Sequence, residues 1–142
     1  MIRPSRGILV LAVMSMAASL TACAGSQDAP VEEVARDFYQ AFADADGEQA
    51  CALLSERTRT EVEKNAETAC DEALLEEDLP AVREPGSVEV FGVMALVRFD
   101  DGPGEPQETT FFSRYDDGWR VTAAGCRPTG EGTPYDCQVS GG

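Results

Sequence analysis

The stretch FFSRYDDGWRVTAAGC, residues 111–126, decides the fold of this 142-residue chain. Two runs rich in aromatic and β-branched residues flank the tripeptide Asp116-Asp117-Gly118. A short Asp-Gly turn between two such runs is typical of a β-hairpin. The stretch therefore predicts two antiparallel strands, the first over residues 108–115 and the second over residues 119–126.

Apolar residues alternate with polar ones on both sides of this hairpin. The segment SVEV predicts a short strand at residues 87–90, and VMALVRF predicts another at 93–99, with Phe91-Gly92 as a tight reversal or a bulge between them. In the second of these strands one face would carry Val93, Ala95, Val97 and Phe99. A final strand is expected around residues 136–140. The second half of the chain is therefore an antiparallel sheet.

The first half has the three-and-four spacing of helices. Asp28 and Pro30 are start signals for a helix whose apolar positions are Val31, Val34, Ala35, Phe38, Phe42 and Ala45. The turn DADG at 44–47 ends it, and EQACALL at 48–54 predicts a short second helix. Ser55 is a good N-cap for a third helix at 56–65, and a fourth is expected at 67–78, before Pro80.

Helices followed by antiparallel strands are the element order of an α+β domain, in which the helices cover one face of the sheet. Residues 30–142 are expected to form a single domain of this class, because their number lies within the range of one hydrophobic core.

The N-terminal residues predict export. Arg3 and Arg6 precede the apolar run GILVLAVMSMAASL at 7–20, which has the length of a signal-peptide core and is short for a membrane span. Leu20-Thr21-Ala22-Cys23 resembles a bacterial lipobox. We expect residues 1–22 to be a lipoprotein signal peptide cleaved between Ala22 and Cys23. Residues 23–29 are then the lipidated (palmitate-bearing) cysteine and a polar tether, and the protein is anchored on the extracytoplasmic face of the cell membrane. The alternative is an ordinary signal peptide that leaves Cys23 as a free thiol.

The chain is strongly acidic. Removal of the signal peptide would leave 9 basic and 26 acidic residues, a net charge of −17. Such a surface repels phosphate backbones, and the sequence shows no basic patch, so nucleic acid is excluded as a partner.

Several soft motifs carry a family resemblance. VARDFYQAFADADGEQACALLSERTR, VFGVMALVRF and FFSRYDDGWRVTAAGC together are similar to the nuclear transport factor two-like (NTF2-like) superfamily, and more narrowly to its small lipoproteins of Gram-positive bacteria. The resemblance covers most of residues 31–126. It implies a curved antiparallel sheet that forms a cone with its helices, and in the ketosteroid isomerase-like (SnoaL-like) enzymes of the superfamily a catalytic residue inside that cone.

With Cys23 lipidated, four cysteines remain, and an oxidising exterior favours disulfides. Of the three pairings, chain order favours Cys51 with Cys70 and Cys126 with Cys137. Redox catalysis and zinc binding are disfavoured, because the chain has no CxxC motif and no histidine. The segment DADGE does not fit a calcium loop, since positions six and twelve hold Gln49 and Ser55. No metal or cofactor is expected.

Candidate site residues are few. The polar ones near the apolar pattern are Asp37, Tyr39, Arg114 and Tyr115, and they form no recognisable catalytic dyad. A pocket at the mouth of the cone would be lined by Phe38, Tyr39, Phe42, Phe111, Tyr115 and Trp119. These aromatic residues, with Phe112, could equally be the core itself.

Two functions remain open. The favoured one is a membrane-anchored accessory or binding domain without catalysis, recognising a partner protein, a wall component or a small apolar ligand. The alternative is a ketosteroid isomerase-like lyase, isomerase or hydrolase that uses a buried carboxylate or tyrosine. A dry cavity around an ionisable residue with a shifted pKa would favour the enzyme, whereas a cone filled by apolar side chains would oppose it.

Overall fold

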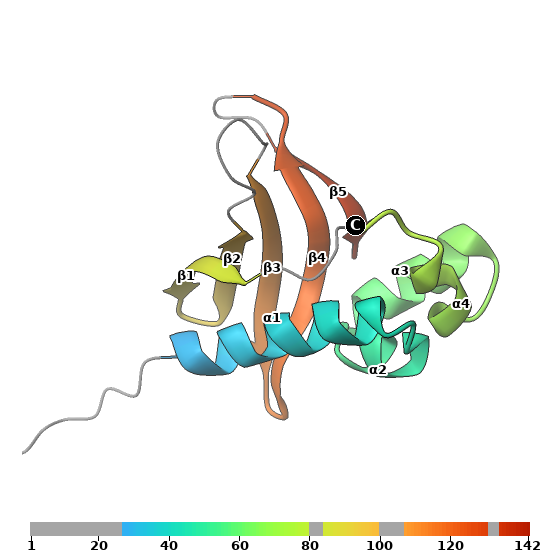
Figure 1. The fold of residues 1–142 in the computed structure, drawn as a ribbon, viewed down its shortest axis with the longest axis horizontal. Helices are drawn as coiled ribbons and strands as arrows, with labels where there is room; N and C mark the ends of the chain where they lie inside the picture. Colours follow the sequence, from blue (N-terminus) through green and yellow to red (C-terminus); the bar gives the residue numbers. More distant parts are fainter. Residues whose placement is uncertain (1–26, 80–83, 100–106, 131–133) are drawn as a thin grey trace, which may run out of the picture.

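The computed structural model describes residues 27–79, 84–99, 107–130 and 134–142. The predicted signal peptide, Cys23 and the first part of the tether lie outside the described residues. Within them, no helix combines the length and the apolar character needed to cross a bilayer. Four helices precede five strands, so the domain is α+β (Figure 1).

The first two helices follow the predicted pattern. Helix α1, Asp28–Ala43, buries Val31, Ala35 and Phe38, which recur at intervals of three and four. The chain then turns through Ala45, whose φ is 56°. Helix α2, Gly47–Ala52, begins where the Asp46 side chain accepts a hydrogen bond from the Gln49 backbone N–H at 3.0 Å. The DADG segment thus ends one helix and caps the next.

The other two helices are joined by a sharp break. Helix α3, Glu56–Ala66, is capped by Ser55, whose Oγ accepts from the Thr58 backbone N–H at 3.2 Å. Glu67 then takes a left-handed conformation with a φ of 57°. Helix α4, Cys70–Leu75, is shorter than the expected range 67–78: it begins three residues later, after the left-handed Glu67, and ends three residues earlier.

The five strands form one antiparallel sheet in the order β1-β2-β3-β4-β5. Their bounds are Pro85–Phe91 for β1, Met94–Phe99 for β2, Glu108–Tyr115 for β3, Gly118–Pro128 for β4 and Tyr135–Ser140 for β5.

The placement of Val93 on the buried face of a strand is wrong. Gly92 has a positive φ of 64°, which makes Gly92-Val93 a two-residue turn, and β2 begins at Met94. Val93 is consequently 60% exposed, whereas Ala95, Val97 and Phe99 are buried as expected.

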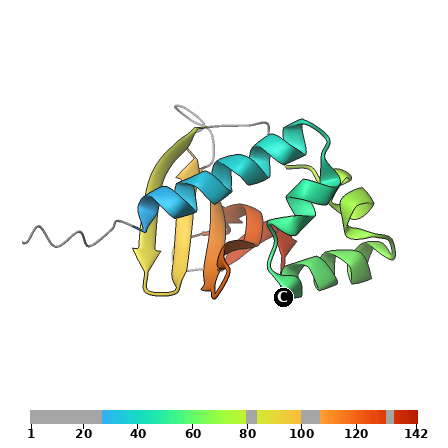
Figure 2. The ribbon, with the colours of Figure 1, turned by 90° about the horizontal axis from the view of Figure 1, so that it is seen from below.

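The two faces of the sheet have different environments. Cross-strand partners share a face, so Ala95, Phe112 and Val121 define an inner face, all of them buried. Leu96, Phe111 and Ala123 define the outer face. Helix α1 crosses the inner face at an angle to the strands, while α2, α3 and α4 gather beside the β4–β5 edge (Figures 1 and 2).

Two disulfides crosslink neighbouring elements of the domain. Cys51–Cys70 joins α2 to α4, and Cys126–Cys137 joins β4 to β5. This is the pairing that chain order favours.

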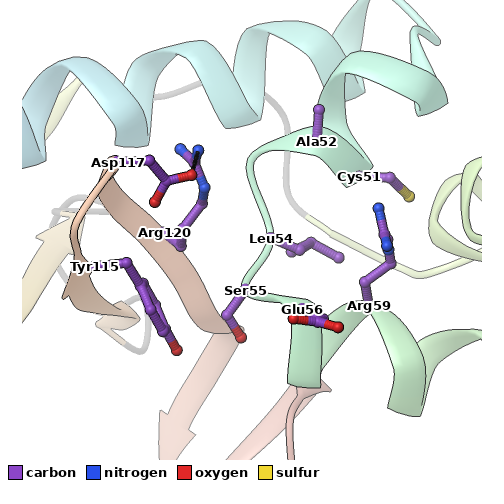
Figure 3. A pocket seen from close by; sticks show the side chains of 9 residues that line it. All are labelled: Cys51, Ala52, Leu54, Ser55, Glu56, Arg59, Tyr115, Asp117 and Arg120. Carbon is purple, nitrogen blue, oxygen red and sulfur yellow. Dashed lines mark hydrogen bonds and ion pairs between the residues drawn. The ribbon is translucent and has the colours of Figure 1, made fainter.

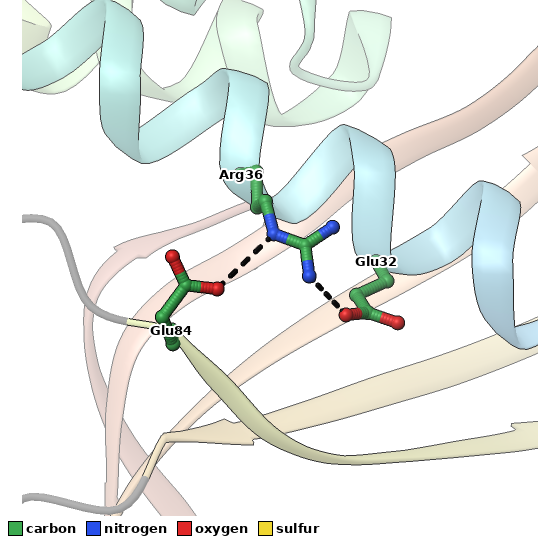
Figure 4. A network of polar contacts seen from close by, with 3 residues as sticks. All are labelled: Glu32, Arg36 and Glu84. Carbon is green, nitrogen blue, oxygen red and sulfur yellow. Dashed lines mark hydrogen bonds and ion pairs between the residues drawn. The ribbon is translucent and has the colours of Figure 1, made fainter.

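An ion-pair network joins α1 to the segment that leads into β1 (Figure 4). The Arg36 guanidinium donates to Glu84 Oε2 through Nε at 3.3 Å and pairs with Glu32 on the same helix. The pKa of Arg36 is raised, chiefly by the hydrogen bond with Glu84. Because the Arg36 and Glu84 side chains are exposed, this network contributes little to stability.

Candidate functional site

A polar cluster lies inside the apolar core, between α1 and the inner face of the sheet. The Tyr39 hydroxyl donates to Glu108 Oε1 at 2.9 Å and lies 2.6 Å from Thr110 Oγ1. Glu108 and Thr110 are two residues apart on β3, so their side chains share the inner face. Exposure is 2% for Tyr39 and 1% for Glu108, which makes this a buried carboxylate held by a buried phenol.

The environment of the cluster favours the neutral phenol. Burial raises the pKa of Tyr39 far above its ordinary value of 10.0, and the nearby negative charge of Glu108 raises it further. The rings of Phe38 and Phe99 pack edge-on against the Tyr39 ring, with centroids 5.3 and 5.0 Å away. Proton transfer to a substrate requires hydrogen-bond reach, and Tyr39, only 2% exposed, offers almost none.

Sequence reasoning named Tyr39 but missed Glu108. The signal was present in ETTFFSRY, where Glu108, Thr110 and Phe112 occupy alternate positions of one strand. Because Phe112 is apolar and expected to be buried, the alternation also indicates that Glu108 lies on the buried face.

The six predicted pocket residues are divided between the two faces of the sheet. Phe38, Tyr39, Phe42 and Trp119 pack into the inner core, and the Trp119 Nε1 atom is buried without a hydrogen-bond partner among the described residues. Phe111 and Tyr115 belong to the outer face and its margin. One common pocket for all six does not form.

The two remaining polar candidates are exposed. Asp37 lies on the solvent side of α1. Arg114, paired with Trp119 across the hairpin, donates from its guanidinium to Gln27 Oε1 at 3.2 Å. Neither residue contacts the Tyr39 cluster through a described hydrogen bond.

Tyr115 lines two adjacent concavities near the outer face. One part, about 330 Å³, lies between the β3–β4 hairpin and the corner between α2 and α3 (Figure 3). Its charged and hydroxyl-bearing walls are Ser55, Glu56, Arg59, Tyr115, Asp117 and Arg120. Arg120 and Asp117 are held together by a 2.6 Å ion pair. This part offers both signs of charge to a ligand.

A second part, about 410 Å³, continues over the outer face. Ser55 and Tyr115 line both parts, and the second adds Met94, Phe111, Ser113, Thr122, Ala123 and the C-terminal glycines. The Arg57 guanidinium holds the Gly142 carbonyl at 3.1 Å, which fixes this wall. We name the two parts together the Tyr115 groove: it is polar at the hairpin end and apolar over the sheet.

The described residues contain no cluster of three or more cysteine, aspartate or glutamate side chains that could hold a metal ion. The Asp44–Gly47 turn serves helix capping, as the Asp46 hydrogen bond shows.

Comparison with known proteins gives no match to any family model, curated protein or solved structure.

Proposed function

We propose that this chain is a lipid-anchored extracytoplasmic lipoprotein whose single NTF2-like domain binds a partner protein and performs no catalysis. The observation that carries the proposal is the contrast between the two faces of the sheet. The inner face, where an enzyme of this superfamily would act, is filled by Phe38, Phe112 and Val121, each fully buried. The outer face carries the Tyr115 groove.

A protein partner suits this groove better than a small apolar ligand. Small-molecule sites enclose most of their ligand, whereas the Tyr115 groove is open along the sheet. Two large side chains that line the groove are themselves exposed: Met94 is 58% exposed and Tyr115 48%. Contiguous exposed apolar surface bordered by polar residues is typical of protein interaction sites. Arg59 and Arg120 at the hairpin end would contact acidic or hydroxyl groups of the partner.

The family assignment rests on the residues quoted above and on the arrangement of elements. Helices that precede an antiparallel sheet, with a long first helix across its inner face, support an NTF2-like cone. The lipid anchor rests on the order Leu20-Thr21-Ala22-Cys23 alone.

A second candidate function is a lyase or isomerase that uses Tyr39 and Glu108. The direct hydrogen bond between a buried phenol and a buried carboxylate favours it, because such pairs hold protons at shifted pKa values. This function requires the core to open, since both side chains are almost completely buried. For that reason we rank it second.

The anchor is tested with Cys23→Ala. The substituted protein should leave the membrane fraction and lose metabolic labelling by fatty acid, because the thiol that carries the lipid is gone. Retention of Cys23→Ala in membranes would refute the lipobox interpretation.

The groove is tested by photo-crosslinking in intact cells. A photoreactive amino acid at Met94, inside the groove, should give a discrete adduct with one partner protein. The matched control is the same amino acid at Glu33, which is exposed on α1 above the other face. Equal adducts from both positions, or an adduct from Glu33 alone, would contradict a binding site in the groove.

A further inference from the structure

The tip of the β1–β2 hairpin exposes two large apolar side chains. Phe91 is 62% exposed and Val93 60%, and Gly92 between them has a φ of 64° that shapes the two-residue turn. We name these three residues the hairpin tip. Phe91 pairs across the hairpin with Met94 at the margin of the Tyr115 groove, so the tip and the groove are neighbouring but separate surfaces.

The start of the described chain lies beside this tip. The Arg114 backbone N–H donates to the Val93 carbonyl at 2.8 Å, and the guanidinium of the same residue donates to Gln27 Oε1. Gln27 and Val93 also line one shallow depression together with Arg114. In both ribbon views the start of α1 and the end of β1 lie at the same end of the molecule (Figures 1 and 2).

Chain length limits how far the tip can be from the predicted anchor. Four peptide units separate Cys23 from Gln27, and they span at most about 14 Å when fully extended. A lipid held at Cys23 would therefore keep Gln27, and the tip next to it, close to the bilayer surface.

We propose that the hairpin tip inserts into the lipid surface beside the anchor, so that the acyl chains and the tip together fix the orientation of the domain. This inference rests on the proposed lipidation of Cys23. Aromatic and aliphatic side chains are the groups that enter the boundary between headgroups and acyl chains. Arg114 next to the tip can contact lipid phosphates, and Asp116, which lines the same depression, is the acidic group that opposes this attraction.

The experiment uses the full-length lipoprotein, purified from membranes and reconstituted into phosphatidylcholine vesicles with brominated acyl chains. Bromine quenches only the indoles that reach the acyl region. The tip carries Phe91→Trp, and the matched control carries Leu75→Trp, which is also exposed but lies on α4 at the other end of the domain. The native Trp119 is buried and supplies the baseline.

The expected result is a shift of the added Phe91→Trp emission to shorter wavelength and its strong quenching, with neither change for Leu75→Trp. Adding Val93→Asp to the Phe91→Trp protein should abolish the quenching while the protein still sediments with the vesicles. If the protein sediments and the two indoles are quenched equally, the tip does not insert, although the anchor stands. If the protein fails to sediment with vesicles at all, the lipid anchor is wrong, and the proposed orientation of the domain is refuted as well.

Discussion

The inner and outer faces of the sheet are built from the same strands but have opposite properties. On β3, Phe112 is completely buried under α1, while its neighbour Phe111 points to the outer face and lines a groove. The inner face even buries a carboxylate, that of Glu108, whereas the outer face leaves Met94 and Tyr115 half exposed. Chemical character alone would have assigned the site to the Tyr39–Glu108 pair. Access is the reason that we propose the outer face instead.

The largest expected loss of stability comes from a substitution in the inner face. Phe38→Ala should lower the free energy of unfolding by about 3–5 kcal/mol, because a fully buried ring leaves a cavity in a packed core. The control Phe91→Ala removes an exposed ring and should change the free energy of unfolding by no more than about 0.5 kcal/mol. Both are measured by denaturant unfolding with the disulfides intact. Equal effects would mean that the inner face is not the core.

The next effect concerns the buried cluster. Tyr39→Phe removes the hydroxyl that binds Glu108 and Thr110, and so takes one hydrogen bond from each of these buried side chains. We expect a loss of about 1–3 kcal/mol. Tyr135→Phe, at an exposed tyrosine, provides the matched control, with an expected loss below about 0.5 kcal/mol. A Tyr39→Phe protein as stable as this control would show that the cluster contributes nothing to the core.

A smaller effect on stability is expected only above about pH 10. The pKa of Tyr39 is higher in the folded state than in the unfolded state. The contribution of Tyr39 to the free energy of unfolding is therefore fully present below about pH 10, and it is lost as the pH rises above that value. Wild-type stability should therefore fall faster than that of Tyr39→Phe, by up to about 1.4 kcal/mol per pH unit. Parallel stability curves for the two proteins above pH 10 would place the Tyr39 hydroxyl in contact with water.

The sequence predicted the parts of this structure that local rules determine. The Ser55 cap, the Asp-Gly hairpin and the period-two strands follow from the chemistry of adjacent residues. The division of the aromatic residues between two faces did not, because Phe111 and Phe112 are consecutive and only the register with β2 and β4 decides which one is covered. The role of Glu108 depended on α1, which brings Tyr39 to it across 69 positions of the chain. The groove joins residues from α3, β3 and the C-terminus, and no local pattern contains it.

The most direct test compares one substitution on each face by the same readout, the yield of the crosslinked adduct from Met94 in cells, normalised to the folded protein present. Tyr39→Phe should leave the yield unchanged, because the inner face takes no part in binding. Tyr115→Ala, which should alter stability by less than about 0.5 kcal/mol, should abolish the adduct because it removes the wall shared by both parts of the groove. The account is contradicted if Tyr39→Phe abolishes the adduct while Tyr115→Ala preserves it.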